Sequence, residues 1–239
     1  MNTKTLALAL AAFPLLFTDC GFNDFDDNSI KVNQDQYVLH YKETAQINPI
    51  TKATDVVYTS ESEYVASVSE SGLITAKRVG EANLHISNMV TCCHVTVKVE
   101  PLYNIYPEPT HDINFGESKA SVKSTFGSNP TEEQTAALVY RNYYKDYDYV
   151  FLFEDEALSA MGVLIPTPSL PDSFTDFLLE RYQMVAFEDG ESTFINQNRD
   201  LGVSMAPSAN SSEIIVAYFP GSTKTKSSSL DLNGQIESL

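Results

Sequence analysis

Residues 56–99 read VVYTSESEYVASVSESGLITAKRVGEANLHISNMVTCCHVTVKV, and this stretch decides the fold. Apolar and polar residues alternate in short runs: Ala82, Leu84 and Ile86 form one apolar series and Val95 to Val99 another. Glycine and serine turns separate the runs. Period-two alternation broken by such turns is typical of antiparallel strands with one buried face. Several closely spaced strands of this kind predict a small β-sandwich.

This stretch resembles the group 2 bacterial immunoglobulin-like domain, with Tyr58 where that family has a tryptophan. With weaker strands from Ile30 onward, the resemblance covers residues 30–100. It implies an all-β Ig-like sandwich that serves as a spacer or adhesive module at the cell surface or envelope, without catalytic residues. The segments that carry the resemblance are Tyr58, Val65–Val68, Gly72–Ala76, Gly80–Leu84 and Val95–Val99.

The N-terminus has the pattern of an export signal. Lys4 precedes an apolar run from Leu6 to Phe17 that is too short to span a membrane as a mature helix. Cys20-Gly21 follows, so residues 1–19 resemble a bacterial lipoprotein signal peptide, with Asp19 where the pattern prefers a small residue. We expect lipidation of Cys20 and therefore attachment to the outer membrane. The alternative is an ordinary secreted protein.

Residues 20–29 are acidic and polar, and we expect a solvated tether. Acidic residues directly after a lipidated cysteine also resemble the surface-export signal of Bacteroidetes lipoproteins. The predicted location is the cell envelope, with the periplasmic and extracellular faces both open.

The composition limits the range of partners. The chain has 239 residues, 43% of them hydrophobic, and a net charge of −17. This length allows one or two domains. A strongly acidic chain lacks the basic face that phosphate binding requires, so nucleic acid is not an expected partner.

Residues 101–111 contain three prolines and form the predicted linker, because proline bars a regular element. An α+β domain is expected over 112–220, followed by a flexible tail over 221–239. Gly116 to Gly127 reads as a helix with Ser118 as its N-cap, and Ser173 to Tyr182 as a second helix. Three strands are expected after each helix, which predicts tandem helix-β-β-β units sharing one six-stranded antiparallel sheet with both helices on one face. The expected strands are 137–140, 147–153, 160–165, 193–196, 202–206 and 214–218.

This second half is similar in outline to small envelope proteins of the outer-membrane assembly and β-lactamase-inhibitor type. The resemblance is one of pattern and transfers no residues. It implies a scaffold that binds protein.

No catalytic residue, cofactor or metal ligand set is expected. Gly202 to Ala206 has the spacing of a nucleophile elbow around Ser204, but the last histidine, His111, precedes it. The carboxylates at 154–156 and 188–189 have the composition of hairpin turns, although a small carboxylate-dependent hydrolase stays as an alternative function. Cys92 and Cys93 are adjacent in a predicted strand, where one side chain points inward and the other outward.

The richest cluster of aromatic residues lies at 140–149. Exposed tyrosines make rigid, amphipathic contact surfaces for proteins or sugars. Tyr143, Tyr144 and Tyr147 are therefore the candidate binding residues, although alternate tyrosines of a sheet can equally belong to its core. The expected function is an envelope lipoprotein whose Ig-like spacer presents a protein- or glycan-binding domain. A purely structural envelope component is the other non-enzymatic alternative.

Overall fold

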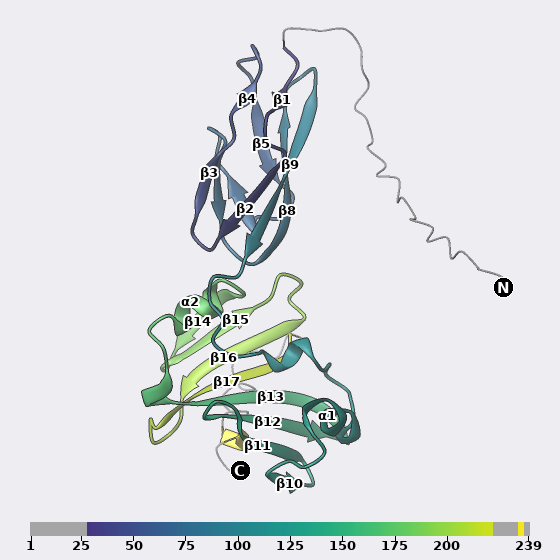
Figure 1. Cartoon of the computed structure of the whole chain (residues 1–239), viewed down its shortest axis with the longest axis vertical. Coiled ribbons are helices and arrows are strands. Elements are labelled where there is room, and N and C mark those ends of the chain that lie inside the picture. The colour runs from purple at the N-terminus through teal and green to yellow at the C-terminus, as the bar shows by residue number, and fades with distance from the viewer. Residues whose placement is uncertain (1–27, 222–233, 237–239) are drawn as a thin grey trace, which may run out of the picture.

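The computed structural model describes residues 28–221 and 234–236, which form two bodies stacked along the long axis of the molecule (Figure 1). Each body has its own cluster of buried apolar side chains. The predicted signal peptide and Cys20 lie outside the described residues, as do most of the tether and most of the tail.

The first body is a β-sandwich. Its four-stranded sheet has the order β2-β9-β8-β5, its three-stranded sheet the order β3-β7-β6, and β1 pairs with β4. Strands β2 and β9 run parallel and the other pairs are antiparallel. The strands are β1 (Lys31–Val32), β2 (Gln36–His40), β3 (Thr44–Gln46), β4 (Pro49–Ile50), β5 (Val57–Ser60), β6 (Ala66–Val68), β7 (Leu73–Ala76), β8 (Gly80–Ser87) and β9 (Cys92–Glu100).

The alternation in the sequence explains this sandwich. Leu84 on β8 and Val97 on β9 are fully buried between the sheets, and the polar residues beside them face outward. Tyr58 packs against the same core, as expected of an aromatic residue at the family's tryptophan position. Its ring lies over Gly72, where an added Cβ would come within 3.0 Å of Tyr58 Cζ. Gly72 has a φ of +80°, so the turn before β7 requires glycine for two reasons.

The second body contains one eight-stranded antiparallel sheet in the order β10-β11-β12-β13-β17-β16-β15-β14. Each half of this sheet is preceded by a short helix (Figure 1). The elements are η1 (Pro109–His111), α1 (Lys119–Phe126), β10 (Glu132–Gln134), β11 (Ala137–Tyr144), β12 (Tyr147–Glu154), β13 (Ala157–Pro166), η2 (Thr167–Ser169), α2 (Phe174–Leu179), β14 (Gln183–Glu188), β15 (Glu191–Ile195), β16 (Leu201–Pro207) and β17 (Glu213–Pro220).

Both helices pack on the same face of this sheet, which we call the inner face. Phe126 of α1 and Phe177 of α2 join Phe151, Val203 and other sheet residues in one core. Helix α1 begins as predicted, because the Ser118 hydroxyl accepts a hydrogen bond from the Ser121 amide. We call the opposite face of the sheet the outer face.

Three details differ from the sequence predictions. The sheet has eight strands, whereas six were expected; the two additional strands are β10 and β14. Strand β10 is a short polar edge strand, and β14 has a register shift between Met184 and Ala186 that breaks its alternation. The predicted linker is not a bare spacer, since Ile105 and Tyr106 are buried in the second core. Ile236, within the predicted tail, is only 2% exposed.

Candidate functional site

The predicted tyrosine site is divided between core and surface. Tyr147 is 2% exposed and its hydroxyl donates a hydrogen bond of 3.2 Å to Ser169 O, so its ring is not available to a ligand. Tyr143 is 40% exposed, with its ring centroid 4.8 Å from that of Tyr149. Tyr144 is half-buried and makes an edge contact with Tyr147. Ligand binding at Tyr143 and Tyr144 stays a prediction.

The carboxylate clusters lie in hairpin turns. Asp155 and Glu156 have φ values of +49° and +66° between β12 and β13, and Asp189 and Gly190 have +53° and +82° between β14 and β15. Two consecutive positive φ values are the mark of the tight two-residue hairpin turn, in which Asp and Gly are favoured. Local turn geometry therefore accounts for these acidic residues.

A buried carboxylate occupies the centre of the second core. Glu108 is 2% exposed and accepts hydrogen bonds from the hydroxyls of Tyr182 at 2.7 Å and Tyr218 at 3.2 Å. Its other oxygen lies 3.0 Å from Nε of Arg181. Tyr106 and Tyr218 share a further hydroxyl hydrogen bond of 2.6 Å. Every polar group in this cluster has a partner, which is the arrangement expected of a structural network.

This network changes the acidity of its tyrosines. Burial raises the pKa of Tyr106, Tyr182 and Tyr218 far above the usual value, and the negative charge of Glu108 raises all three further. Burial likewise raises the pKa of the nearby Tyr149, whose hydroxyl donates to Pro107 O at 2.6 Å. These phenols stay neutral in the folded protein.

Arg181 and its neighbour Glu180 contact both the linker and the sandwich. The fully buried carboxylate of Glu180 bonds to the Arg181 guanidinium and accepts the amides of Leu102 at 2.9 Å and Tyr103 at 3.1 Å. Its backbone carbonyl accepts the Val79 amide of the sandwich at 2.7 Å. From the sandwich side, Tyr64 donates to Arg181 O at 2.7 Å. Glu180 and Arg181, directly after α2, thus connect the two bodies through hydrogen bonds.

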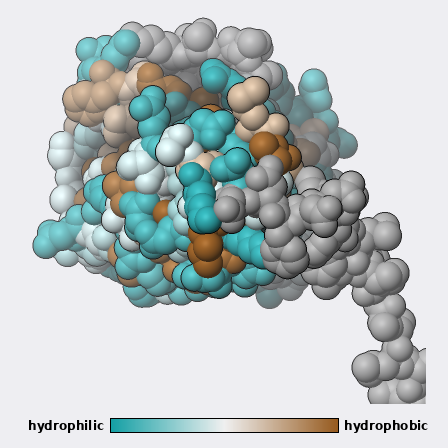
Figure 2. All heavy atoms as spheres, turned by 90° about the horizontal axis from the view of Figure 1, so that it is seen from above, coloured by the Kyte–Doolittle hydropathy of each residue, from teal (hydrophilic) through white to brown (hydrophobic). Residues whose placement is uncertain are grey.

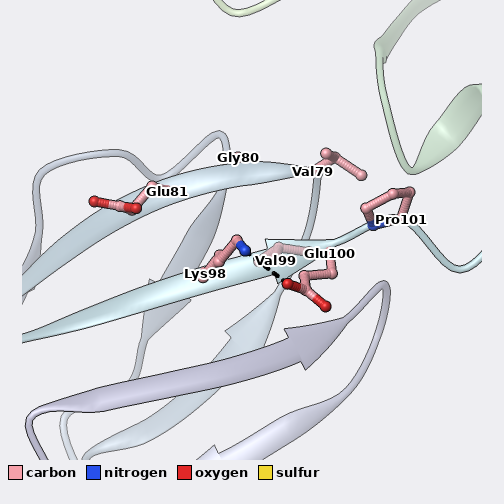
Figure 3. Close-up of a pocket in the computed structure, with 7 residues that line it drawn as sticks. All are labelled: Val79, Gly80, Glu81, Lys98, Val99, Glu100 and Pro101. Carbon is pink, nitrogen blue, oxygen red and sulfur yellow. Dashed lines mark hydrogen bonds and ion pairs between the residues drawn. The ribbon is translucent and has the colours of Figure 1, made fainter.

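A groove of about 440 Å³ lies near this joint, at the base of the sandwich (Figure 3). Two of its three charged side chains, Lys98 and Glu100, point toward one another and form an ion pair of 2.7 Å; the third is Glu81. Its remaining wall is formed by Val79–Glu81, Val99 and Pro101. One ion pair, one further carboxylate and a few small apolar side chains offer little that would fix a ligand's orientation.

The far end of the sandwich presents isolated apolar residues. Met89 is 95% exposed, and Val90 and Ile50 are more than half exposed. Figure 2 views the molecule from this end, and the hydrophobic residues appear in small groups separated by hydrophilic ones. Scattered apolar residues of this kind are normal on a monomer surface.

The outer face of the eight-stranded sheet differs from all of these. A line of small side chains crosses seven strands at a right angle, each residue paired in register with the next. With strands about 4.8 Å apart, this line extends over roughly 29 Å. Larger residues flank it, Leu152 and Phe219 on one side, Leu164 and Ile215 on the other. We call it the small-residue row: Val139, Val150, Gly162, Ala217, Ser204, Thr193 and Ala186.

Two buried polar atoms on the outer face have no hydrogen-bond partner among the described residues. Ser204, in the small-residue row, is fully buried, and Glu191, two residues before Thr193 on the same face, is 6% exposed. Neither Ser204 Oγ nor Glu191 Oε1 has a hydrogen-bond partner within the described part of the chain. An unpaired buried polar atom costs about 1–3 kcal/mol, so these two atoms are suited to a donor group supplied by something that docks there.

The sequence contained a signal for this surface that its alternation alone did not reveal. Strand β12 is buried at every position from Tyr147 to Phe153, and β13 from Ala160 to Ile165. Strands that are apolar on both faces indicate a sheet covered on both faces. The inner face is covered by α1 and α2, so the burial of the outer face requires a separate cover.

Within the described residues, no helix has the length and apolar character needed to cross a membrane. The same part of the chain holds no cluster of three or more metal-binding side chains. Cys92 is exposed and Cys93 is half-buried against the sandwich core, where burial raises the pKa of the Cys93 thiol.

Among the comparisons with known proteins, a family match is found only in the N-terminal part of the chain, which includes most of the first body. The family profile of the bacterial Ig-like domain (group 2) matches residues 22–88, under half of the chain. No curated protein matches the sequence. The matched segment ends before β9, so the closing strand of the sandwich lies beyond it.

Similar solved structures include an intimin mutant of EHEC O157:H7, with 11% identity over 71% of this chain and 86% of that chain, at a TM-score of 0.27. Domains 5-6 of the S-layer protein SbsC match at 12% identity over 82% and 86%, with a TM-score of 0.26. Human protocadherin-24 EC1-2 matches at 10% identity over 80% and 93%, also at 0.26. Scores this low carry no argument about the whole chain. Within this chain, residues 22–88 are similar to the bacterial Ig-like domain of group 2.

Proposed function

We propose that this protein is a non-catalytic component of a bacterial cell envelope, in which the Ig-like sandwich carries the eight-stranded unit as a protein-binding module. Lipidation of Cys20 would anchor it in the outer membrane, a proposal that rests on the sequence pattern around Cys20-Gly21. The presence of an Ig-like domain supports the envelope location.

The second body is proposed to be an α+β domain built as a tandem repeat. Each half has a short helix followed by four antiparallel strands, and the halves meet where β13 pairs with β17. Such a repeat yields one continuous sheet with a broad face opposite the helices. This arrangement supports a scaffold that presents a surface.

The observation that carries the binding proposal is Ser204, a fully buried hydroxyl in the middle of the small-residue row that has no hydrogen-bond partner among the described residues. Small side chains allow close approach of another chain. A donor on that chain could hydrogen-bond to Ser204 Oγ, which would remove the cost of leaving this buried oxygen unpaired. A protein partner fits this face better than a glycan, because the row and its flanks are mainly aliphatic, with Phe219, Ser204, Thr193, Asp148 and Glu191 as the exceptions. By contrast, the clustered carboxylates lie in turns and Glu108 is fully partnered, so no observation favours the hydrolase alternative.

Site-specific photocrosslinking tests this proposal. A photoreactive amino acid replaces Thr193, half-buried in the small-residue row, or Thr59, exposed on β5 of the sandwich as a matched strand threonine. Applied to envelope extract of the producing bacterium, the Thr193 variant is expected to capture a discrete protein that the Thr59 variant does not. Support also requires that the purified captured protein bind the unchanged chain directly. Equal capture at both positions, or none at Thr193, would contradict a binding role for the outer face.

A further inference from the structure

We infer that the small-residue row is a docking site for a short segment that inserts an isoleucine side chain, and that the chain's own C-terminal residues 234–236 are its resident occupant. This deepens the proposed function: an external partner of the outer face must displace the resident segment.

The side chain of Ile236 lies against Gly162 on β13, and we call this position the seat. An added Cβ at this position would lie 2.7 Å from Ile236 Cδ1 and 3.6 Å from Ile236 Cγ1, whereas Val150 Cβ would be at an ordinary 3.8 Å. Gly162 has no positive φ, so the backbone does not demand glycine there. Glycine in the interior of a strand costs stability, and it often marks the close approach of another group. Here the close group is Ile236.

The burial of Ile236 shows that it fills this seat. Ile236 is 2% exposed, although an added Cβ on Gly234, two residues earlier, would meet no atom within 4 Å. It belongs to the buried cluster of the outer face, in which every other member comes from strands β11, β12, β13 or β17. Within this cluster of described residues, Ile236 is the one side chain that comes from outside the sheet.

The surroundings leave room for a larger occupant. A cavity of about 310 Å³ adjoins Ile236, lined by Leu164, Arg141, Glu213 and the turn from Ser208 to Asn210. In the other direction, Ser204 follows Gly162 and Ala217 along the row, two strand spacings or roughly 10 Å from the seat. A partner segment can thus seat an apolar side chain over Gly162 and donate a hydrogen bond to Ser204 Oγ.

The test uses full-length protein and a fluorescein-labelled peptide with the sequence of residues 228–239, followed by fluorescence anisotropy. In the unchanged chain the tethered segment competes at high effective concentration and keeps the peptide out. Ile236→Asp vacates the seat, because a carboxylate is not tolerated among apolar residues. We expect the Ile236→Asp chain to bind the peptide about tenfold to a hundredfold more tightly than the unchanged chain does, the range for one buried isoleucine.

Three controls make the result specific. Gly234→Ala adds a methyl group that contacts nothing within 4 Å, so this chain should exclude the peptide as the unchanged chain does. Adding Gly162→Val to Ile236→Asp fills the seat and should weaken peptide binding at least tenfold, with circular dichroism confirming that the sheet is retained. A peptide carrying Asp in place of the isoleucine should not bind. Ile236→Ala serves as a milder variant of the vacated seat.

Two outcomes would overturn the inference. One is equal peptide binding, or none, for the unchanged and Ile236→Asp chains. The other is a dimer of the unchanged chain, in analytical ultracentrifugation, that dissociates on Ile236→Asp, since this would assign the segment to a second copy. The proposed function fails separately: loss of the Thr193 crosslink with peptide binding intact would leave the C-terminal segment without an external competitor.

Discussion

Replacing Arg181 with methionine is expected to lower the free energy of unfolding by about 3–5 kcal/mol, the cost of breaking a buried ion pair from one side. The guanidinium lies between two buried carboxylates, Glu108 and Glu180, and its side chain is only 16% exposed. Without it, both buried carboxylates lose their cationic partner, and this loss is what makes breaking a buried pair from one side costly. Urea denaturation followed by circular dichroism measures the change.

A matched surface variant separates this effect from the loss of any ion pair. Lys77 forms a pair of 2.9 Å with Glu63, but these side chains are 36% and 62% exposed. Lys77→Met should therefore cost less than about 1 kcal/mol. If Arg181→Met and Lys77→Met destabilise the protein equally, the network around Glu108 is not a main support of the second core.

Alkaline pH is expected to unfold the second body cooperatively. Burial raises the pKa of Tyr106, Tyr149, Tyr182 and Tyr218 well above the value near 10 that they have in the unfolded chain. Because the folded state keeps these phenols neutral, their contribution is complete below pH 10 and is lost as the pH rises above it. Four such groups together remove roughly 5 kcal/mol per pH unit.

Tyrosinate absorbance at 295 nm, recorded together with circular dichroism, measures this transition. The half-exposed tyrosines should ionise first, and the buried ones only in a step that coincides with loss of the sheet signal. Tyr149→Phe removes one buried phenol and should make stability fall less steeply with pH. Ionisation of all 13 tyrosines of the chain in a single wave near pH 10, with the sheet intact, would contradict the burial described above.

Local pattern was enough to predict much of this fold. Period-two alternation placed β8 and β9 of the sandwich, and Ser118 and Gly127 marked the two ends of α1. Six strands of the second body were expected close to where β11, β12, β13, β15, β16 and β17 lie. These features depend on residues near one another in the sequence, so the sequence alone can reveal them.

The remaining features depend on contacts across long sequence separations. Glu108 meets Arg181 and Tyr218 only after the sheet has formed, and nothing around Pro107–Pro109 identifies a buried charge. Strand β14 lost its alternation through a register shift. The docking of Ile236 on Gly162 joins a predicted tail to the middle of a strand. The candidate site was missed because its row runs across the strands, at right angles to the chain.

The affinity of the captured partner for two arginine variants tests the binding role of the outer face most directly. Thr193→Arg places a long, charged side chain in the small-residue row, and Thr59→Arg makes the same change on the sandwich. Measured by surface plasmon resonance, Thr193→Arg is predicted to weaken binding at least thirtyfold, about 2 kcal/mol, whereas Thr59→Arg should leave it within about twofold. Unchanged affinity for Thr193→Arg, or an equal loss for Thr59→Arg, would contradict the assignment of the outer face as the binding site.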